Sequence, residues 1–128
     1  MSSESRAVTW DRSSTVSRPV FADIDAAFSD VHRILGRKWH LRIVYHLLED
    51  GPLGFSDLKD RLDGVSSKML SESLSSLEED SLVAREIVSD QPVRVKYSLT
   101  EQGGALEAPV EELLQWGTAH STSAEAER

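Results

Sequence analysis

Hydrophobic residues recur three or four positions apart in five stretches of the chain, the spacing that puts side chains on one face of a helix. The clearest stretch is 65–80, where Leu70, Leu74 and Leu77 form a narrow apolar stripe opposite short polar residues. The pattern therefore predicts five amphipathic helices, at 21–35, 37–50, 55–62, 65–80 and 101–116.

The predicted helices have recognisable end signals. Hydroxyl side chains that can accept an unpaired amide in the first turn predict N-caps at Ser56, Ser66 and Thr100. Glycines that favour a helix end predict stops at Gly36, Gly51 and Gly117. The last helix begins with Gly103 and Gly104, each expected to weaken it by about 1 kcal/mol relative to alanine.

A second periodicity follows the helix at 65–80. Residues 93–99 alternate strictly between apolar and polar side chains, which is typical of a strand. The run 81–88 is also rich in β-forming residues, and the turn-forming residues 89–92 separate the two. A hairpin that directly follows two helices joined by Asp63-Gly64 predicts a winged helix-turn-helix, a mainly α fold with a small β-hairpin.

Length and composition indicate one domain with frayed ends. Of the 128 residues, 20–117 are expected to form the domain, with disordered tails at 1–19 and 118–128. The chain has no cysteine, which excludes disulfides and thiolate metal sites. It has no signal-peptide core and no run near the roughly 20 apolar residues that a membrane span needs. We therefore expect a cytoplasmic protein with no membrane partner.

The charge balance complicates a nucleic-acid interpretation. The formal net charge is −8, whereas DNA-binding domains are usually basic. Salt screens charges beyond roughly 8–10 Å, so a local basic face can still attract phosphate. The hairpin offers such a face in Arg85, Arg94 and Lys96. The acidic total also suits a protein that stays soluble in high salt, so a halophilic source is a hypothesis.

Catalytic and cofactor-binding signals are missing from the sequence. The four histidines show no metal-ligand spacing, and no Gly-rich phosphate loop is present. The many carboxylates fall on faces that look solvated. We therefore expect no enzymatic activity, no metal and no cofactor.

Five blocks of the sequence carry a further signal when they are taken together. They are Gly36–Trp39, Phe55–Leu58, Val65–Ser71, Leu77–Val83 and Pro92–Gly103. In their order and spacing, and over about 31–117, these blocks resemble the HxlR-type winged helix-turn-helix regulators, relatives of the MarR group.

The resemblance implies a sequence-specific transcriptional regulator that acts as a homodimer on a pseudo-palindromic site in double-stranded DNA. By analogy with the family, the DNA-contacting residues would be Ser56, Ser66, Ser67, Lys68, Ser71, Glu72, Ser75, Arg85, Arg94 and Lys96. The first and last helices would form the dimer interface through Phe21, Ile24, Phe28, Leu106, Val110, Leu113, Leu114 and Trp116. From the residues alone, the last helix could equally pack on its own first helix.

Three departures from the family pattern affect these expectations. Gly54 and Ser73 stand where the family often has arginine, so fewer phosphate contacts and a flatter salt dependence are expected. The cysteine through which some members sense oxidants is missing.

The alternative is a winged helix that binds a protein instead of DNA, which the acidic total and Glu72 favour slightly. The effector, the target gene and the sign of regulation are not readable from the sequence.

Overall fold

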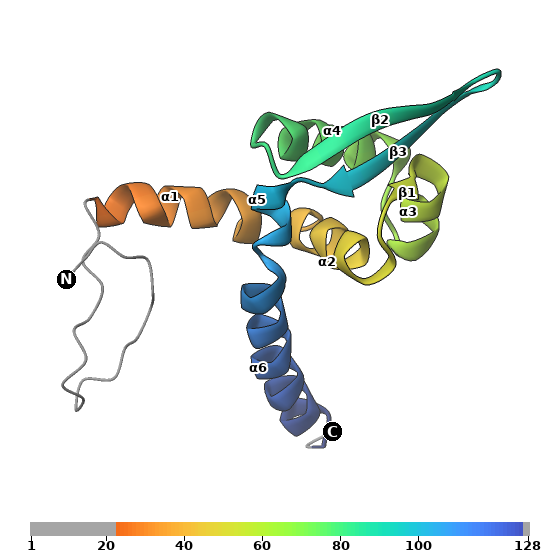
Figure 1. The fold of residues 1–128 in the computed structure, drawn as a ribbon. Coiled ribbons are helices and arrows are strands. Elements are labelled where there is room, and N and C mark those ends of the chain that lie inside the picture. Colours follow the sequence, from red (N-terminus) through yellow and green to blue (C-terminus); the bar gives the residue numbers. More distant parts are fainter. Residues whose placement is uncertain (1–22, 127–128) are drawn as a thin grey trace. The chain divides into compact units, whose positions relative to one another are not determined.

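The computed structural model describes residues 23–126, with side chains described to residue 121. The chain divides into two compact units at the Arg37–Lys38 boundary. The first contains helix α1, and the second contains the helix-turn-helix, the sheet and the C-terminal helices (Figure 1). No helix in the described part of the chain is long and apolar enough to cross a membrane.

Helix α1 spans Ile24–Leu35. The Asp23 carboxylate caps it by accepting the Ala26 amide at 3.1 Å, and Gly36 follows its end, as predicted. Phe21, where the sequence predicted the helix to begin, lies outside the described residues. Most of the large apolar side chains of α1 are exposed, and these are Ile24, Phe28, Val31 and Leu35.

Helix α2 spans His40–Asp50 and supplies the centre of the second unit. Its first turn begins after Trp39, three residues later than predicted, and it ends at Gly51, whose φ is +77°. Its buried residues are joined in the core by the apolar faces of α3 and α4. The core residues without measurable exposure are Ile43, Val44, Leu58, Leu70 and Leu77.

Helices α3 (Phe55–Arg61) and α4 (Ser67–Glu79) form the predicted helix-turn-helix. The Ser66 hydroxyl caps α4 by accepting the Met69 amide at 3.0 Å, which confirms that N-cap. The prediction that Ser56 caps α3 is wrong. Gly54 is the N-cap, because Asp57 Oδ2 accepts the Gly54 amide at 3.1 Å.

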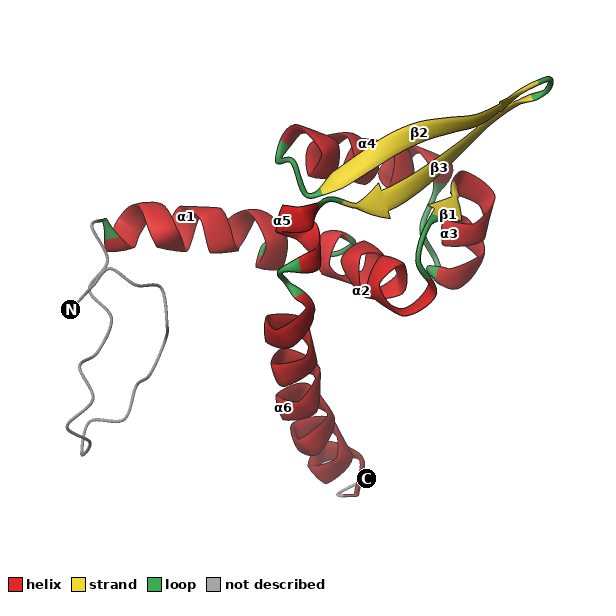
Figure 2. Ribbon diagram, in the orientation of Figure 1, coloured by secondary structure: helices red, strands yellow, loops and turns green. Residues whose placement is uncertain are grey.

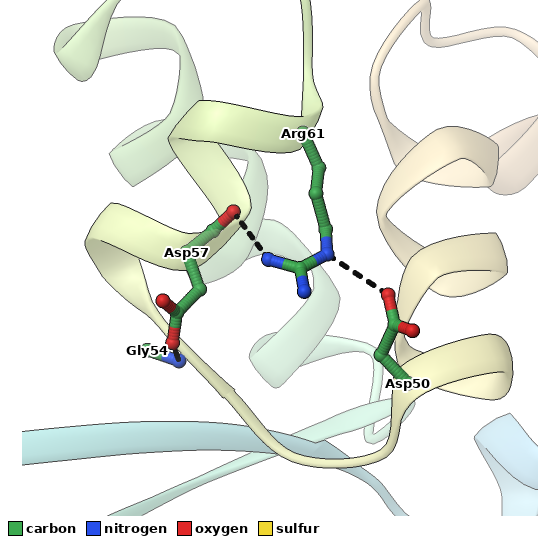
Figure 3. A network of polar contacts seen from close by, with 4 residues as sticks. All are labelled: Asp50, Gly54, Asp57 and Arg61. Carbon is green, nitrogen blue, oxygen red and sulfur yellow. Dashed lines mark hydrogen bonds and ion pairs between the residues drawn. The ribbon is translucent and has the colours of Figure 1, made fainter.

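A polar network ties the start of the helix-turn-helix to the end of α2 (Figure 3). The Arg61 guanidinium donates from Nε to Asp50 Oδ2 at 2.9 Å and from a terminal nitrogen to the Asp57 carbonyl at 3.1 Å. Asp57 in turn holds Gly54 through its side chain. The Arg61–Asp50 contact therefore holds α3 against α2 on the solvent side, while Leu58 packs in the core.

The end of α4 is closed by a Schellman motif. The Ser81 amide donates to the Glu78 carbonyl at 2.9 Å, and the Leu82 amide to the Leu77 carbonyl at 3.0 Å. This geometry needs a left-handed residue after the helix, and Ser81 adopts it with φ of +62°. The chain thus uses a serine where glycine is the usual residue.

The sheet has three antiparallel strands in the order β1-β3-β2 (Figure 2). Their bounds are Leu53–Gly54 for β1, Val83–Asp90 for β2 and Val93–Leu99 for β3. The long β2–β3 hairpin is the wing. Asp90 pairs with Val93, so the wing turns through Gln91 and Pro92 and its loop is shorter than the predicted 89–92. The peptide bond between these two residues is cis. The register shifts between Ile87 and Ser89, where β2 carries a bulge.

The C-terminal helix differs from the prediction in two ways. It is two helices, α5 (Glu101–Gly104) and α6 (Glu107–Ala126). Thr100 is the predicted N-cap, and its hydroxyl accepts the Gly103 amide at 3.0 Å. The predicted stop at Gly117 is wrong, because α6 continues to Ala126. The stretch 118–126, predicted to be a disordered tail, is therefore helical. With these corrections, the predicted winged helix-turn-helix fold is confirmed.

Candidate DNA-binding surface

Helix α4 presents a polar face to solvent. Its leucine stripe of Leu70, Leu74 and Leu77 is buried, so the opposite side of the helix is free. Every α4 residue predicted to contact DNA, and the N-cap before it, is exposed: Ser66, Ser67, Lys68, Ser71, Glu72 and Ser75. Small hydroxyl side chains leave room for a groove edge to approach and can donate or accept hydrogen bonds.

Ser73 belongs to the other side of α4. Its side chain is 6% exposed, so this position faces the core rather than the polar face. The expectation that the missing arginine at this position removes a phosphate contact therefore does not fit the placement of Ser73.

The first turn of α3 is less open to phosphate than the sequence suggests. Ser56 is exposed, as its predicted role requires. However, the Asp57 carboxylate already accepts the Gly54 amide at this helix start. A carboxylate at that place repels a phosphate and uses one of the donors that would bind it.

The wing divides its charges between two faces. Directly paired residues of an antiparallel ladder share a face. Arg85 pairs with Tyr97, whereas Lys96 pairs with Glu86 and Arg94 with Ser89. Because side chains alternate along a strand, Arg94 and Lys96 lie on one face and Arg85 on the other. The prediction that all three share a cationic face is therefore wrong.

The positive charge on the Arg94 and Lys96 face of the wing is partly offset by Glu86, a residue that the sequence pattern did not single out. Glu86 is exposed and stands directly opposite Lys96. Opposite charges at paired positions attract each other, so part of the Lys96 charge is offset. Glu86 could have been found only from the register, because its place in the sequence says nothing about its partner.

Arg85 instead belongs to the side of the sheet that faces the domain. Burial raises the pKa of Tyr97, the nearby Glu78 carboxylate raises it further, and Arg85 opposes both. Tyr97 thus lies near the Glu78 carboxylate of α4 and the Arg85 guanidinium of β2, the strand that pairs with it. Arg85 is exposed but is set apart from Arg94 and Lys96.

The residues predicted to form a dimer interface differ in their exposure. Ile24 and Phe28 on α1, and Leu113, Leu114 and Trp116 on α6, are among the most exposed large apolar side chains. Leu106 is half-buried, and Phe21 lies outside the described residues. Val110 is 1% exposed within the protomer, so it belongs to the core and is not available to a partner.

Trp116 has a local partner on α6. The indole and the His120 ring lie with centroids 4.3 Å apart, and His120 Nδ1 is 2.7 Å from the Trp116 carbonyl. The indole is nevertheless 64% exposed. Together with Leu113 and Leu114, it leaves an apolar side of α6 uncovered.

This arrangement offers the polar face of α4 and the charged wing to a groove. Among the described residues, no group of three or more His, Asp or Glu side chains lies close enough to hold a metal ion.

Comparison with known families decides the classification. A family model described as HxlR-like helix-turn-helix matches residues 34–125. The chain belongs to the HxlR family. This HxlR-family chain is 38% identical over 93 residues to the HTH-type transcriptional regulator YodB of Bacillus subtilis, covering 73% of this chain and 79% of YodB. It is 37% identical over 99 residues to the regulator BH0655 of Halalkalibacterium halodurans, covering 77% and 88% of the two chains.

Solved structures place the HxlR-family fold among winged-helix regulators. The reduced form of the redox regulator HypR matches with a TM-score of 0.70 at 31% identity, covering 78% of this chain and 98% of HypR. A MarR-family regulator from Enterococcus faecalis V583 matches with a TM-score of 0.69 at 30% identity, covering 86% and 99%. The chain is a DNA-binding transcriptional regulator with a helix-turn-helix.

Proposed function

We propose that the protein acts in the cytoplasm as a homodimer that regulates transcription by occupying a pseudo-palindromic DNA site. The observation that carries this proposal is the exposed polar face of α4 opposite a fully buried leucine stripe. A helix anchored in this way can enter a major groove without loss of core packing. Occupancy of a site requires no catalytic group, so we propose no enzymatic role.

Two uncovered apolar surfaces support the homodimer. On α1, Ile24, Phe28, Val31 and Leu35 recur at spacings of four, three and four, the heptad spacing of a helix–helix seam. On α6, Leu113, Leu114 and Trp116 are uncovered. Binding to a pseudo-palindromic site would require the dimer to hold two copies of α4 about one duplex turn apart, roughly 34 Å.

The few cations of the surface support binding of modest affinity. Each protomer offers Lys68 on α4 and Arg94 and Lys96 on one face of the wing. If all three reach phosphates in both protomers, the slope of log affinity against log salt is roughly −5. Glu72 and Glu86 reduce the attraction further. This slope is an upper limit, reached only if every cation contacts a phosphate; a halophilic source is a hypothesis.

Any effector of this protein must act without a cysteine, unlike the effectors of regulators that sense oxidants through a thiol. YodB has been solved in a quinone-bound form and HypR in an oxidised form. The present sequence contains no cysteine, so no effector can act here by forming or breaking a bond to a cysteine sulfur. We propose that any small-molecule effector binds non-covalently.

The first experiment is selection of bound duplexes from a random pool at low and at molar salt. We expect an enriched sequence with two related half-sites. Mass measurement in solution should give twice the chain mass, and Trp116→Ala with Leu113→Ala should shift the protein toward the monomer. Absence of any enriched sequence, or a monomer at the concentrations that bind DNA, would refute the proposal.

The wing assignment has its own test in a mobility-shift titration. Arg94→Ala with Lys96→Ala should weaken binding to all duplexes alike, because phosphate contacts carry no sequence information. Arg85→Ala removes one positive charge from the opposite face, so its effect should be smaller than that of either single variant, Arg94→Ala or Lys96→Ala. Lys68→Ala or Ser71→Ala on α4 should instead change the sequence preference. Equal losses from Arg85→Ala and from the two single variants would contradict the assignment.

A further inference from the structure

Met69 is the one large apolar side chain that α4 exposes, and the structure describes this helix in full. Met69 is 43% exposed, whereas the leucines of the same helix are buried. On the rest of the outward side the helix carries hydroxyls, Lys68 and carboxylates. A thioether among these groups needs an apolar partner if the helix enters a groove, because it cannot replace the hydrogen bonds of displaced water.

The position of Met69 in the helix is fixed by the cap. The Ser66 hydroxyl accepts the Met69 amide at 3.0 Å, and the Ser66 carbonyl accepts the Leu70 amide at 2.9 Å. Met69 therefore lies in the first turn of α4. The first turn of a recognition helix in a helix-turn-helix is the part that reaches base edges.

The neighbours of Met69 border the polar face. Glu72 is three residues along the helix and Ser73 four, so these are its side-chain neighbours. Glu72 is exposed and Ser73 is buried, which places Met69 at the boundary between the core side and the polar side. An unbranched side chain at this boundary can extend toward the groove floor without leaving its helix position.

Base chemistry limits what such a side chain can recognise. In the major groove, base edges present hydrogen-bond donors and acceptors, and the one apolar group among them is the 5-methyl group of thymine. Methionine has no strong donor or acceptor. We propose that Met69 is a specificity-determining residue that contacts a thymine methyl group in each half-site, an inference that rests on the proposed function.

The test is a double-mutant cycle between protein and DNA. The duplex enriched from the random pool is remade with deoxyuridine at each thymine in turn, which removes the methyl group and leaves the hydrogen-bonding groups unchanged. At one thymine per half-site, affinity should fall by about fourfold per methyl group, from the burial of one methylene-sized group. With Met69→Ala, the same replacement should have no effect.

Two variants separate this role from general damage to the helix. Met69→Leu keeps an apolar side chain of similar size and should retain the preference for thymine over uracil. Glu79→Ala, exposed on the same helix and outside the proposed DNA contacts, should also retain it, since it does not remove the apolar contact. Circular dichroism checks that each variant is folded. If Met69→Ala does not fold, Met69→Gln takes its place: it keeps the length and the helix propensity of the side chain but ends in a polar amide, so the uracil replacement should have no effect on its affinity.

The outcomes distinguish this inference from the proposed function. An enriched duplex that binds equally well with uracil at every thymine would overturn the role of Met69 and leave the regulator proposal standing. A uracil effect that persists in Met69→Ala would do the same. Failure to enrich any duplex would overturn both.

Discussion

The two adjacent glycines of α5 should respond in opposite directions to alanine. Gly103 is buried, and an added Cβ would collide with the Leu82 carbonyl oxygen and press on Leu99 Cδ2 at 3.1 Å. Gly104 has nothing within 4 Å of its Cβ position. Neither residue has a positive φ, so alanine fits the backbone at both.

The magnitudes follow from two opposing effects. Alanine in place of glycine favours a helix by about 1 kcal/mol. Overpacking costs about 1–3 kcal/mol, and the upper end applies at Gly103 because the obstructing atom is backbone. The Thr100 amide also holds this carbonyl at 3.0 Å. Gly103→Ala should therefore lose about 2 kcal/mol of unfolding free energy, whereas Gly104→Ala should gain up to about 1 kcal/mol.

Thermal and urea denaturation followed by circular dichroism measure both variants. For a domain of this size the melting temperature should fall by about 10 °C for Gly103→Ala and rise by about 5 °C for Gly104→Ala. Protein concentration must be equal in all samples, because the melting temperature of a dimer depends on it. A Gly103→Ala protein as stable as the unaltered chain, or equal losses at both positions, would refute the close approach of α5 to Leu82.

Three further predictions concern single contacts. Ser81→Gly should raise the unfolding free energy by about 0.5–1 kcal/mol in a urea titration, because it relieves a left-handed serine; Ser81→Ala should not. Burial lowers the pKa of His46 and Arg61 lowers it further, against the opposing charges of Asp50 and Glu49. The folded protein therefore binds the His46 proton less readily than the unfolded chain, so melting temperature should fall as pH drops below about 6.5. His46→Gln should flatten that decline, and an unchanged pH profile would contradict this placement. Arg61→Ala should cost at most about 1 kcal/mol, since the pair with Asp50 is partly exposed; a loss equal at 0.1 and 1 M salt would show that the ion pair contributes nothing.

Helical periodicity predicted the core well because the buried residues repeat at a spacing that only a helix satisfies. Leu70, Leu74 and Leu77 illustrate this, and all are nearly inaccessible. The Ser66 and Thr100 caps were also predictable, since their hydroxyls serve amides only three residues away. Local signals of this kind need no knowledge of the rest of the fold.

The face of Arg85 could not be predicted because it depends on the register of the whole hairpin. A four-residue turn at 89–92 would pair Arg85 with Lys96 and put their charges together. The structure instead has a two-residue turn and a bulge between Ile87 and Ser89, which pairs Arg85 with Tyr97. A shift of one residue moves a side chain to the opposite face.

The C-terminal helices show two further limits of local signals. Gly103 looked like a weak helix residue, yet it is needed where α5 approaches a carbonyl from a distant part of the chain. Gly117 looked like a stop, but its φ is not positive and α6 continues through it. The Trp116–His120 ring contact spans Gly117, and a contact worth about 0.5–1.5 kcal/mol can offset the cost of about 1 kcal/mol for a glycine inside a helix.

Thr100 stands where three elements meet. Its hydroxyl donates to the Ser81 carbonyl at 2.6 Å, just beyond α4, and accepts a hydrogen bond from the Gly103 amide at 3.0 Å. Its backbone amide donates to the Leu82 carbonyl at 3.0 Å. The wing ends one residue before Thr100, and the path toward α6 starts one residue after it. A duplex that bends the wing and a partner chain that twists α6 would therefore both strain the hydrogen bonds of Thr100, the first through β3 and the second through α5.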